Sequence, residues 1–223
     1  DLVRSRGLGD VYKRQQGELT VPCFQGLLRL GGLRARDLSS PTPEWSFWVR
    51  GERVSVGLLT GYNKQYGRMK VDVNFTLDDF VMRGWGLEDV QAFRASVQSI
   101  DNPRKEYFFD GRLALFLSRA GVEEALRKSG LSEAEFVNKR FLFSRLGAAF
   151  ELRAGRLRGP VPIGDDAIVS GVRLEGLESL FFRNQKVEGS PNAVTPWTEV
   201  LAKIRGHEAF VKKYPLGREA GNE

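Results

Sequence analysis

The chain has 223 residues, of which 41% are hydrophobic and 28% charged, enough to form a hydrophobic core in one domain. This composition excludes intrinsic disorder, and no apolar run reaches the roughly 18 residues that a membrane-spanning helix needs. With one cysteine and one histidine, a single chain can form neither a disulfide framework nor a Cys/His zinc site. The net charge of +6 favours anionic partners.

The first residues differ in character from the rest. Residues 1–15, DLVRSRGLGDVYKRQ, resemble translated sequencing-adapter read-through at the edge of a metagenomic gene fragment, and we treat them as a non-native leader. They hold four basic and two acidic residues, so the remainder has a net charge of +4 instead of +6. We expect one domain over residues 16–214, a flexible tail over 215–223, and no membrane attachment. The single cysteine favours a reducing, cytoplasmic compartment.

The first half of the sequence alternates like strands. Residues 18–29 predict an edge strand or the start of a strand, because Pro22 cannot donate a backbone hydrogen bond within a sheet. Apolar residues then alternate over 45–49 and 54–58, on either side of Gly51-Glu52, and again over 69–75. This spacing predicts a three-stranded antiparallel meander from about 44 to 75, with a hairpin turn at Gly51.

The second half has apolar residues at helical spacing. Short helices are predicted from Thr76 to Gly84, from Val90 to Ile100, over 113–120 and over 122–129. Ser132 and Glu135 form a capping box that starts a further helix, with Leu131 and Phe136 as its hydrophobic staple. Over about 133–153 the apolar residues gather on two opposite sides of a helical projection. A helix with two apolar faces is buried between layers, so we expect it at the centre of the core.

The remaining elements complete an α+β fold. Short strands are predicted over 167–169, 172–174 and 180–182, and a last helix from Thr195 to Gly206 that packs back through Trp197. The predicted fold class is therefore α+β: an N-terminal antiparallel β meander, a central helical array around the buried helix 133–153, a short β segment and a C-terminal helix.

Residues 122–140 resemble the helix-turn-helix pattern. Gly130 ends the first helix, Ser132 starts the second, and the apolar Phe136 follows six positions after the glycine. The resemblance implies that Ser132, Glu133 and Glu135 face base edges, yet two acids near phosphates are unfavourable. Any two helices joined by a capped turn give the same pattern, and we favour that plain helix hairpin.

Basic residues gather between Phe136 and Arg158, where six of them accompany one acid. A phosphate backbone needs such a cluster, and single-stranded bases stack on aromatic side chains. We therefore predict an intracellular protein that binds nucleic acid or another polyanion through Lys139, Arg140, Arg145, Arg153, Arg156, Arg158, Lys64, Arg68, Tyr62, Tyr66 and Trp48. The alternative interpretation is a rim of solvated arginines, beside a sheet with an aromatic core face and a basic solvent face.

Two other functions stay open. Asp165, Asp166 and Glu175 make a metal-dependent enzyme possible, one that acts on a phosphorylated or nucleic-acid substrate. Only that alternative calls for a cofactor, Mg²⁺, and no metal site is otherwise expected. No phosphate-binding loop or dinucleotide fingerprint occurs, and His207 is interpreted as a surface residue. The third hypothesis is a protein-interaction subunit of a larger complex, anchored by exposed aromatic side chains.

Overall fold

The computed structural model describes residues 13–14, 17–61, 67–101, 107–117, 126–127, 130–163, 168–174, 185–187 and 194–205. Most of these residues form β-strands, and the helices are short. The strands are β1 (Lys13–Arg14), β2 (Glu18–Cys23), β3 (Gly26–Arg36), β4 (Glu44–Ser55), β5 (Met69–Lys70), β6 (Asp72–Arg83), β7 (Val90–Ser99), β8 (Tyr107–Asp110), β9 (Arg140–Phe143), β10 (Arg145–Arg153), β11 (Arg156–Pro162), β12 (Val169–Leu174), β13 (Gln185–Val187) and β14 (Val194–Pro196). The helices are α1 (Val56–Gly61), the 3₁₀ turn η2 (Leu87–Asp89), α2 (Gly111–Leu117), α4 (Glu133–Val137) and α5 (Trp197–Arg205).

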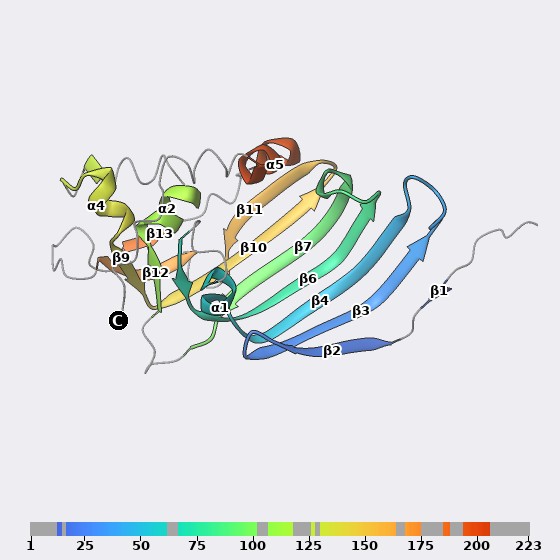
Figure 1. Cartoon of the computed structure of the whole chain (residues 1–223), viewed down its shortest axis with the longest axis horizontal. Coiled ribbons are helices and arrows are strands. Elements are labelled where there is room, and N and C mark those ends of the chain that lie inside the picture. The colour runs from blue at the N-terminus through green and yellow to red at the C-terminus, as the bar shows by residue number, and fades with distance from the viewer. Residues whose placement is uncertain are drawn as a thin grey trace, which may run out of the picture.

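The long strands form one wide antiparallel sheet, the main sheet, in the order β2–β3–β4–β6–β7–β10–β11 (Figure 1). A smaller group of strands, β5, β8, β9 and β12, continues from one end of it. These short strands follow or precede long ones in the chain, as β5 precedes β6 and β9 precedes β10. Several neighbours, such as β2 with β3 and β6 with β7, are successive in the chain and joined by short connections, whereas β7 pairs with β10 across the segment that holds β8 and β9.

Side chains alternate between the two faces of the main sheet except at bulges, and the faces differ in character because paired residues lie on the same side. The apolar face carries Leu19 and Val21 of β2, Leu28 and Leu30 of β3, Trp45, Phe47 and Val49 of β4, Phe75, Leu77, Phe80 and Met82 of β6, Phe93, Ala95 and Val97 of β7, Ala148, Phe150 and Leu152 of β10, and Leu157 of β11. The charged face carries rows such as Asp78, Arg94, Glu151 and Arg158.

The buried core covers only one end of the apolar face. Its cluster includes Val73, Tyr107, Phe136, Phe141 and Phe143, contributed by β6, β8, α4 and β9. From the main sheet, apolar side chains of β3, β6 and β7 pack against this cluster: Leu28, Phe75 and Val97. The core therefore lies where the small strands and short helices meet the main sheet.

Bulges interrupt the long strands at several points. The register shifts between Gly31 and Arg34 in β3, and between Asp78 and Val81 in β6, where Asp79 has a positive φ of 52°. It shifts again between Val81 and Met82, whose partners on β7 are Ala92 and Val90. Each bulge adds one residue to one strand and bends it.

The expectation of an α+β fold with a central helical array is wrong, since the chain is dominated by one large antiparallel sheet. The helix predicted over 133–153 is the five-residue α4 followed by β9 and β10. Its two apolar sides are the core-facing side chains of two strands, with Phe141 and Phe143 on β9 and Leu152 on β10 all buried. The residues expected to form one central helix therefore belong to two consecutive strands, which within the described residues pair with other strands and not with each other.

Three other predictions about local structure are also wrong. No hairpin turn occurs at Gly51, because β4 runs unbroken from Glu44 to Ser55. The helix expected after Thr76 is the second half of β6, and the helix expected from Val90 is β7. Strand structure is confirmed at Val169 and over 172–174, although one strand, β12, replaces the two that were expected; residues 167 and 180–182 lie outside the described residues.

Other details of the sequence analysis are confirmed. Pro22 lies in β2, an edge strand whose partner among the described residues is β3. In the capping box, the Ser132 amide donates to Glu135 Oε2 (2.9 Å) and the Glu135 amide donates to Ser132 Oγ (3.3 Å). Helix α2 covers the first part of the predicted helix 113–120. Trp197 begins α5 after a short strand and packs edge-to-face on Phe93, 6.0 Å between ring centroids.

Candidate interaction surface

The basic residues predicted to bind nucleic acid do not form one patch. Arg140 and Arg145 lie at the beginnings of β9 and β10, whereas Arg153 and Arg156 flank the turn at the far end of β10. Arg153 follows Arg140 by thirteen positions, and an extended chain of that length separates the two Cα atoms by up to about 43 Å. Arg140 stacks over the Phe108 ring at 4.9 Å, and Arg145 approaches Asp101 at 3.5 Å. The charge cluster in the sequence is therefore divided between two ends of the sheet.

The remaining candidates are similarly dispersed. Lys139 precedes β9, Arg68 precedes β5, and Arg158 lies on the charged face opposite Glu151. The Trp48 ring lies over Gly31, where an added Cβ would come within 2.2 Å of it, and the Arg50 guanidinium is 5.0 Å from the ring centroid. Several candidates lie outside the described residues: Tyr62, Lys64, Tyr66, Asp165, Asp166, Glu175 and His207.

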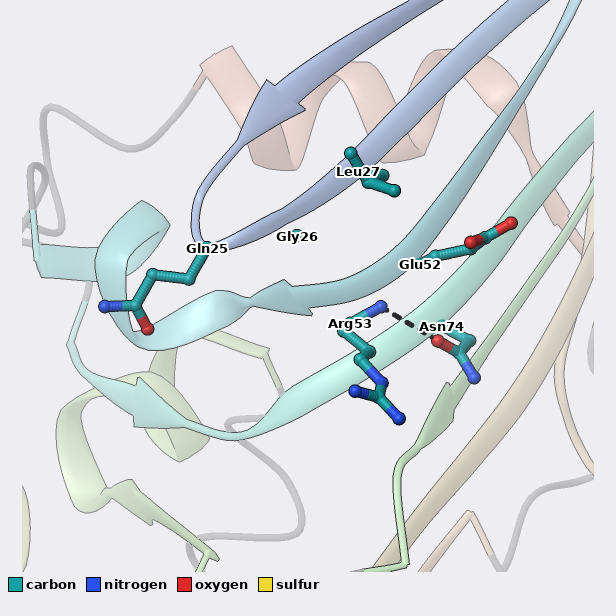
Figure 2. A pocket seen from close by; sticks show the side chains of 6 residues that line it. All are labelled: Gln25, Gly26, Leu27, Glu52, Arg53 and Asn74. Carbon is teal, nitrogen blue, oxygen red and sulfur yellow. Dashed lines mark hydrogen bonds between the residues drawn. The ribbon is translucent and has the colours of Figure 1, made fainter.

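One pocket of about 470 Å³ opens where the β2–β3 turn meets the bulge of β4 (Figure 2). Its lining includes Glu52, Arg53 and Asn74, and Asn74 Oδ1 accepts a hydrogen bond from the Arg53 amide (2.9 Å). Figure 2 shows the Gln25 and Arg53 side chains pointing in different directions. A binding pocket needs polar groups that converge on one ligand, and this one lacks that arrangement.

The larger feature is the part of the apolar face that the core leaves open. This open apolar face comprises Leu30, Trp45, Phe47, Val49, Leu77, Phe80 and Met82, all partly exposed, with Leu19 and Val21 at its margin on β2. Leu19 is 58% exposed and Val21 is 42% exposed. In Figure 1 no described helix crosses the middle of β3, β4 and β6. Contiguous exposed apolar surface of this kind marks interaction sites on folded proteins.

No charged side chain occupies a paired position on the open apolar face among the described residues. Its aromatic residues are closely packed, with the Phe47 and Phe80 rings stacked at 4.4 Å between centroids. By contrast, the opposite face has arginines, glutamates and aspartates interspersed, which is typical of a solvated sheet face. The charged face is therefore suited to solvent, and the open apolar face is suited to contact with another apolar surface.

A rigid loop extends this surface at the end of β6. Trp85 is 65% exposed and contacts the Trp45 ring edge-to-face at 5.3 Å. Asp89 Oδ2 accepts hydrogen bonds from the amides of Trp85 (3.0 Å) and Gly86 (2.9 Å). From the other side, Trp197 Nε1 donates to the Leu87 carbonyl (2.9 Å). An exposed tryptophan held in place by its loop has the character of an interface anchor.

Prolines occupy outward positions on β2 and on β11, the two outer strands of the main sheet, where β11 also pairs over residues 156–158 with the short strand β14. Cys23 and Gly26 flank a two-residue turn, and the residues that flank such a turn form a hydrogen-bonded pair. Backbone groups alternate in direction along a strand, so Pro22, which precedes Cys23, directs its backbone nitrogen away from β3. On β11, the Ile163 amide donates to Gly147 of β10, so Pro162 and Pro160 direct theirs outward. A proline at such a position removes a donor that an added strand would need.

The open apolar face could not be recognised in the sequence because the second half of β6 and the whole of β7 were predicted as helices. One signal was present: the alternation of Trp45 and Phe47 placed both on one side of a strand, with Trp48 on the other, and the register agrees. Leu77 and Phe80, however, are three residues apart and fit a helix as well as a bulged strand.

Comparison with known proteins adds no assignment: no protein-family model, curated protein or solved structure matches the chain. Within the described ranges, none of the helices has the length and apolar character needed to cross a membrane. The same part of the chain contains no group of three or more His, Cys, Asp or Glu residues arranged to hold a metal ion.

Proposed function

We propose that this protein is an interaction subunit that binds another protein surface through the open apolar face. The observation that carries the proposal is a partly exposed, uncharged sheet face, continuous with the core at one end and bordered by Trp85 at the other. Burying partly exposed Phe, Leu and Trp side chains removes apolar area from water at about 25 cal/mol per Å², and this gain favours association against the entropic cost of binding. The charged face, with its interspersed ion pairs, stays in solvent.

A photo-crosslinking experiment tests this proposal. A benzophenone amino acid replaces Val49 on the apolar face or Arg50, the next residue of β4, on the charged face. We expect adducts heavier than the 25.0 kDa chain from position 49 and none from position 50. Equal yields at the two positions, or no adduct from position 49, would contradict the proposal.

Nucleic-acid binding is a second proposal, with a smaller surface than the sequence predicted. It is supported by Arg34, Arg153 and Arg156, which lie at the same end of the main sheet and have no ion-pair partner among the described residues. A fluorescence titration with single- and double-stranded oligonucleotides at two salt concentrations tests it. Phosphate contacts predict binding that weakens steeply with salt, and no binding at low salt would rule the proposal out.

A further inference from the structure

We infer that the partner of the open apolar face is a second copy of this chain, bound face to face about a two-fold axis. The inference rests on the proposed function and names its partner. A face without charged residues requires an apolar partner surface, and large exposed apolar surfaces are uncommon on soluble proteins. The chain itself supplies one of matching size at equal concentration, and a two-fold interface pairs a surface with itself.

The architecture that results is a common one. Two sheets stacked on their apolar faces lie about 10 Å apart and cross at about 30°, which forms a β-sandwich. Among the residues that the structure describes, this second layer is present at the core end of the main sheet, where α4, β8 and β9 cover it. A second copy would supply the missing layer over β3, β4 and β6.

The size of the face sets the expected affinity. It spans four strands and about six residues along each, so its projected area is roughly 20 Å by 20 Å, or about 400 Å² per copy. Two copies would bury about 800 Å² over these four strands, with Leu19 and Val21 of β2 included, and Trp85 brings the total to roughly 1,000 Å². That is the lower limit for specific interfaces, so the dimer should be reversible, with a Kd on the order of micromolar.

The sheet edges argue against the other way in which β-proteins associate. Exposed edge strands pair with strands of other molecules unless a feature prevents it. Here Pro22 interrupts the row of outward donors on β2, while on β11 the pairing with β14 covers residues 156–158 and Pro160 and Pro162 interrupt the part beyond it. Association through the face does not use those donors, so the prolines leave it unaffected.

Sedimentation equilibrium over about 1–200 μM wild-type protein tests the inference. We expect a monomer–dimer equilibrium. Leu19→Asp introduces a charge at the margin of the face on an exposed side chain, and should raise the dimer Kd at least tenfold. Leu27→Asp is the matched control, because Leu27 is also exposed and lies one hairpin strand away on the opposite face. The control should leave Kd within about twofold.

Each outcome separates the two proposals. A wild-type monomer throughout the range overturns the homodimer, while crosslinks from position 49 to a chain of another mass would still support the proposed function. A dimer that Leu19→Asp and Leu27→Asp weaken equally overturns the face-to-face geometry. Leu77→Asp at the centre of the face should abolish the dimer, and circular dichroism with thermal unfolding identifies a misfolded variant.

Discussion

Asp110 joins two segments that are distant in sequence, and its removal should destabilise the fold strongly. The side chain caps α2 by accepting a hydrogen bond from the Leu113 amide (2.9 Å), and its other oxygen accepts one from the Arg68 amide (2.7 Å). Asp110→Ala therefore loses a helix cap and leaves two backbone donors without that acceptor. With about 1 kcal/mol for the cap and about 1–3 kcal/mol for the second donor, we expect a loss of roughly 2–4 kcal/mol.

Urea unfolding followed by tryptophan fluorescence measures this loss. The control is Asp101→Ala, which removes a carboxylate that is 75% exposed. This carboxylate forms an ion pair with Arg145 at 3.5 Å, and an exposed ion pair contributes about 0–1 kcal/mol. If Asp110→Ala were no more destabilising than the control, the hydrogen bonds described for Asp110 would not contribute to stability.

The pH dependence of Asp110 gives a second test of the same site. Burial raises the pKa of this carboxyl above its ordinary value of 3.8, while the two amide hydrogen bonds oppose the rise. A raised pKa means that the folded state binds the proton more tightly. The contribution of this group to stability is therefore complete below pH 3.8 and falls as pH rises through the folded-state pKa. Asp110→Asn does not titrate, so the wild-type advantage over it should shrink with rising pH in that window.

Three other predictions concern separate elements. Gly51→Ala should lower the free energy of unfolding by about 1–3 kcal/mol, because its Cβ would meet the Phe75 ring at 2.1 Å; a neutral effect in urea unfolding would show that the ring moves freely. Ser132→Ala should raise the pKa of Glu135, which the Ser132 hydroxyl and amide hold below its usual range; carboxyl NMR titration measures it, and an unchanged pKa would contradict the capping box. Pro22→Val should restore a donor to the β2 edge and cause concentration-dependent aggregation, detected by light scattering; equal scattering from wild type would argue against a protective role for Pro22.

The sequence predicted local features well where one short-range interaction determines them. The Ser132–Glu135 capping box needs only four residues, and the edge position of Pro22 follows from its missing N–H. The alternation of Trp45 and Phe47 likewise indicated a strand with one aromatic side. These interactions do not depend on how the rest of the chain folds.

The helices were mispredicted because bulges change the spacing of apolar residues. In β6 the apolar face is formed by Phe75, Leu77, Phe80 and Met82, with steps of two, three and two residues. In β9 and β10 the step of three falls between Phe143 and Leu146, on either side of Ser144. A three-residue step among steps of two is close to the period of a helix, and a single sequence does not separate the two.

The candidate site was harder to predict than the fold. Its residues come from strands spread over more than sixty positions, from Leu19 to Met82, and their union depends on the pairing of β2, β3, β4 and β6. Positive charge is the conspicuous feature of residues 139–158 in the sequence, but in the structure these basic residues are divided between two ends of the sheet. That one face lacks charged residues can be recognised only once the pairing register of these strands is known.

The bulge at Asp79 determines which face of the main sheet each following residue of β6 occupies. With Asp79 present, Phe80 and Met82 share a face with Leu77, and Arg83 meets Glu44 on the other face. Deleting this one residue would invert every side chain from Phe80 to Arg83, so that an arginine would enter the apolar face and an aromatic ring would leave it. Position 79 therefore tolerates a change of side chain far better than a change in the number of residues, although it lies on the exposed surface.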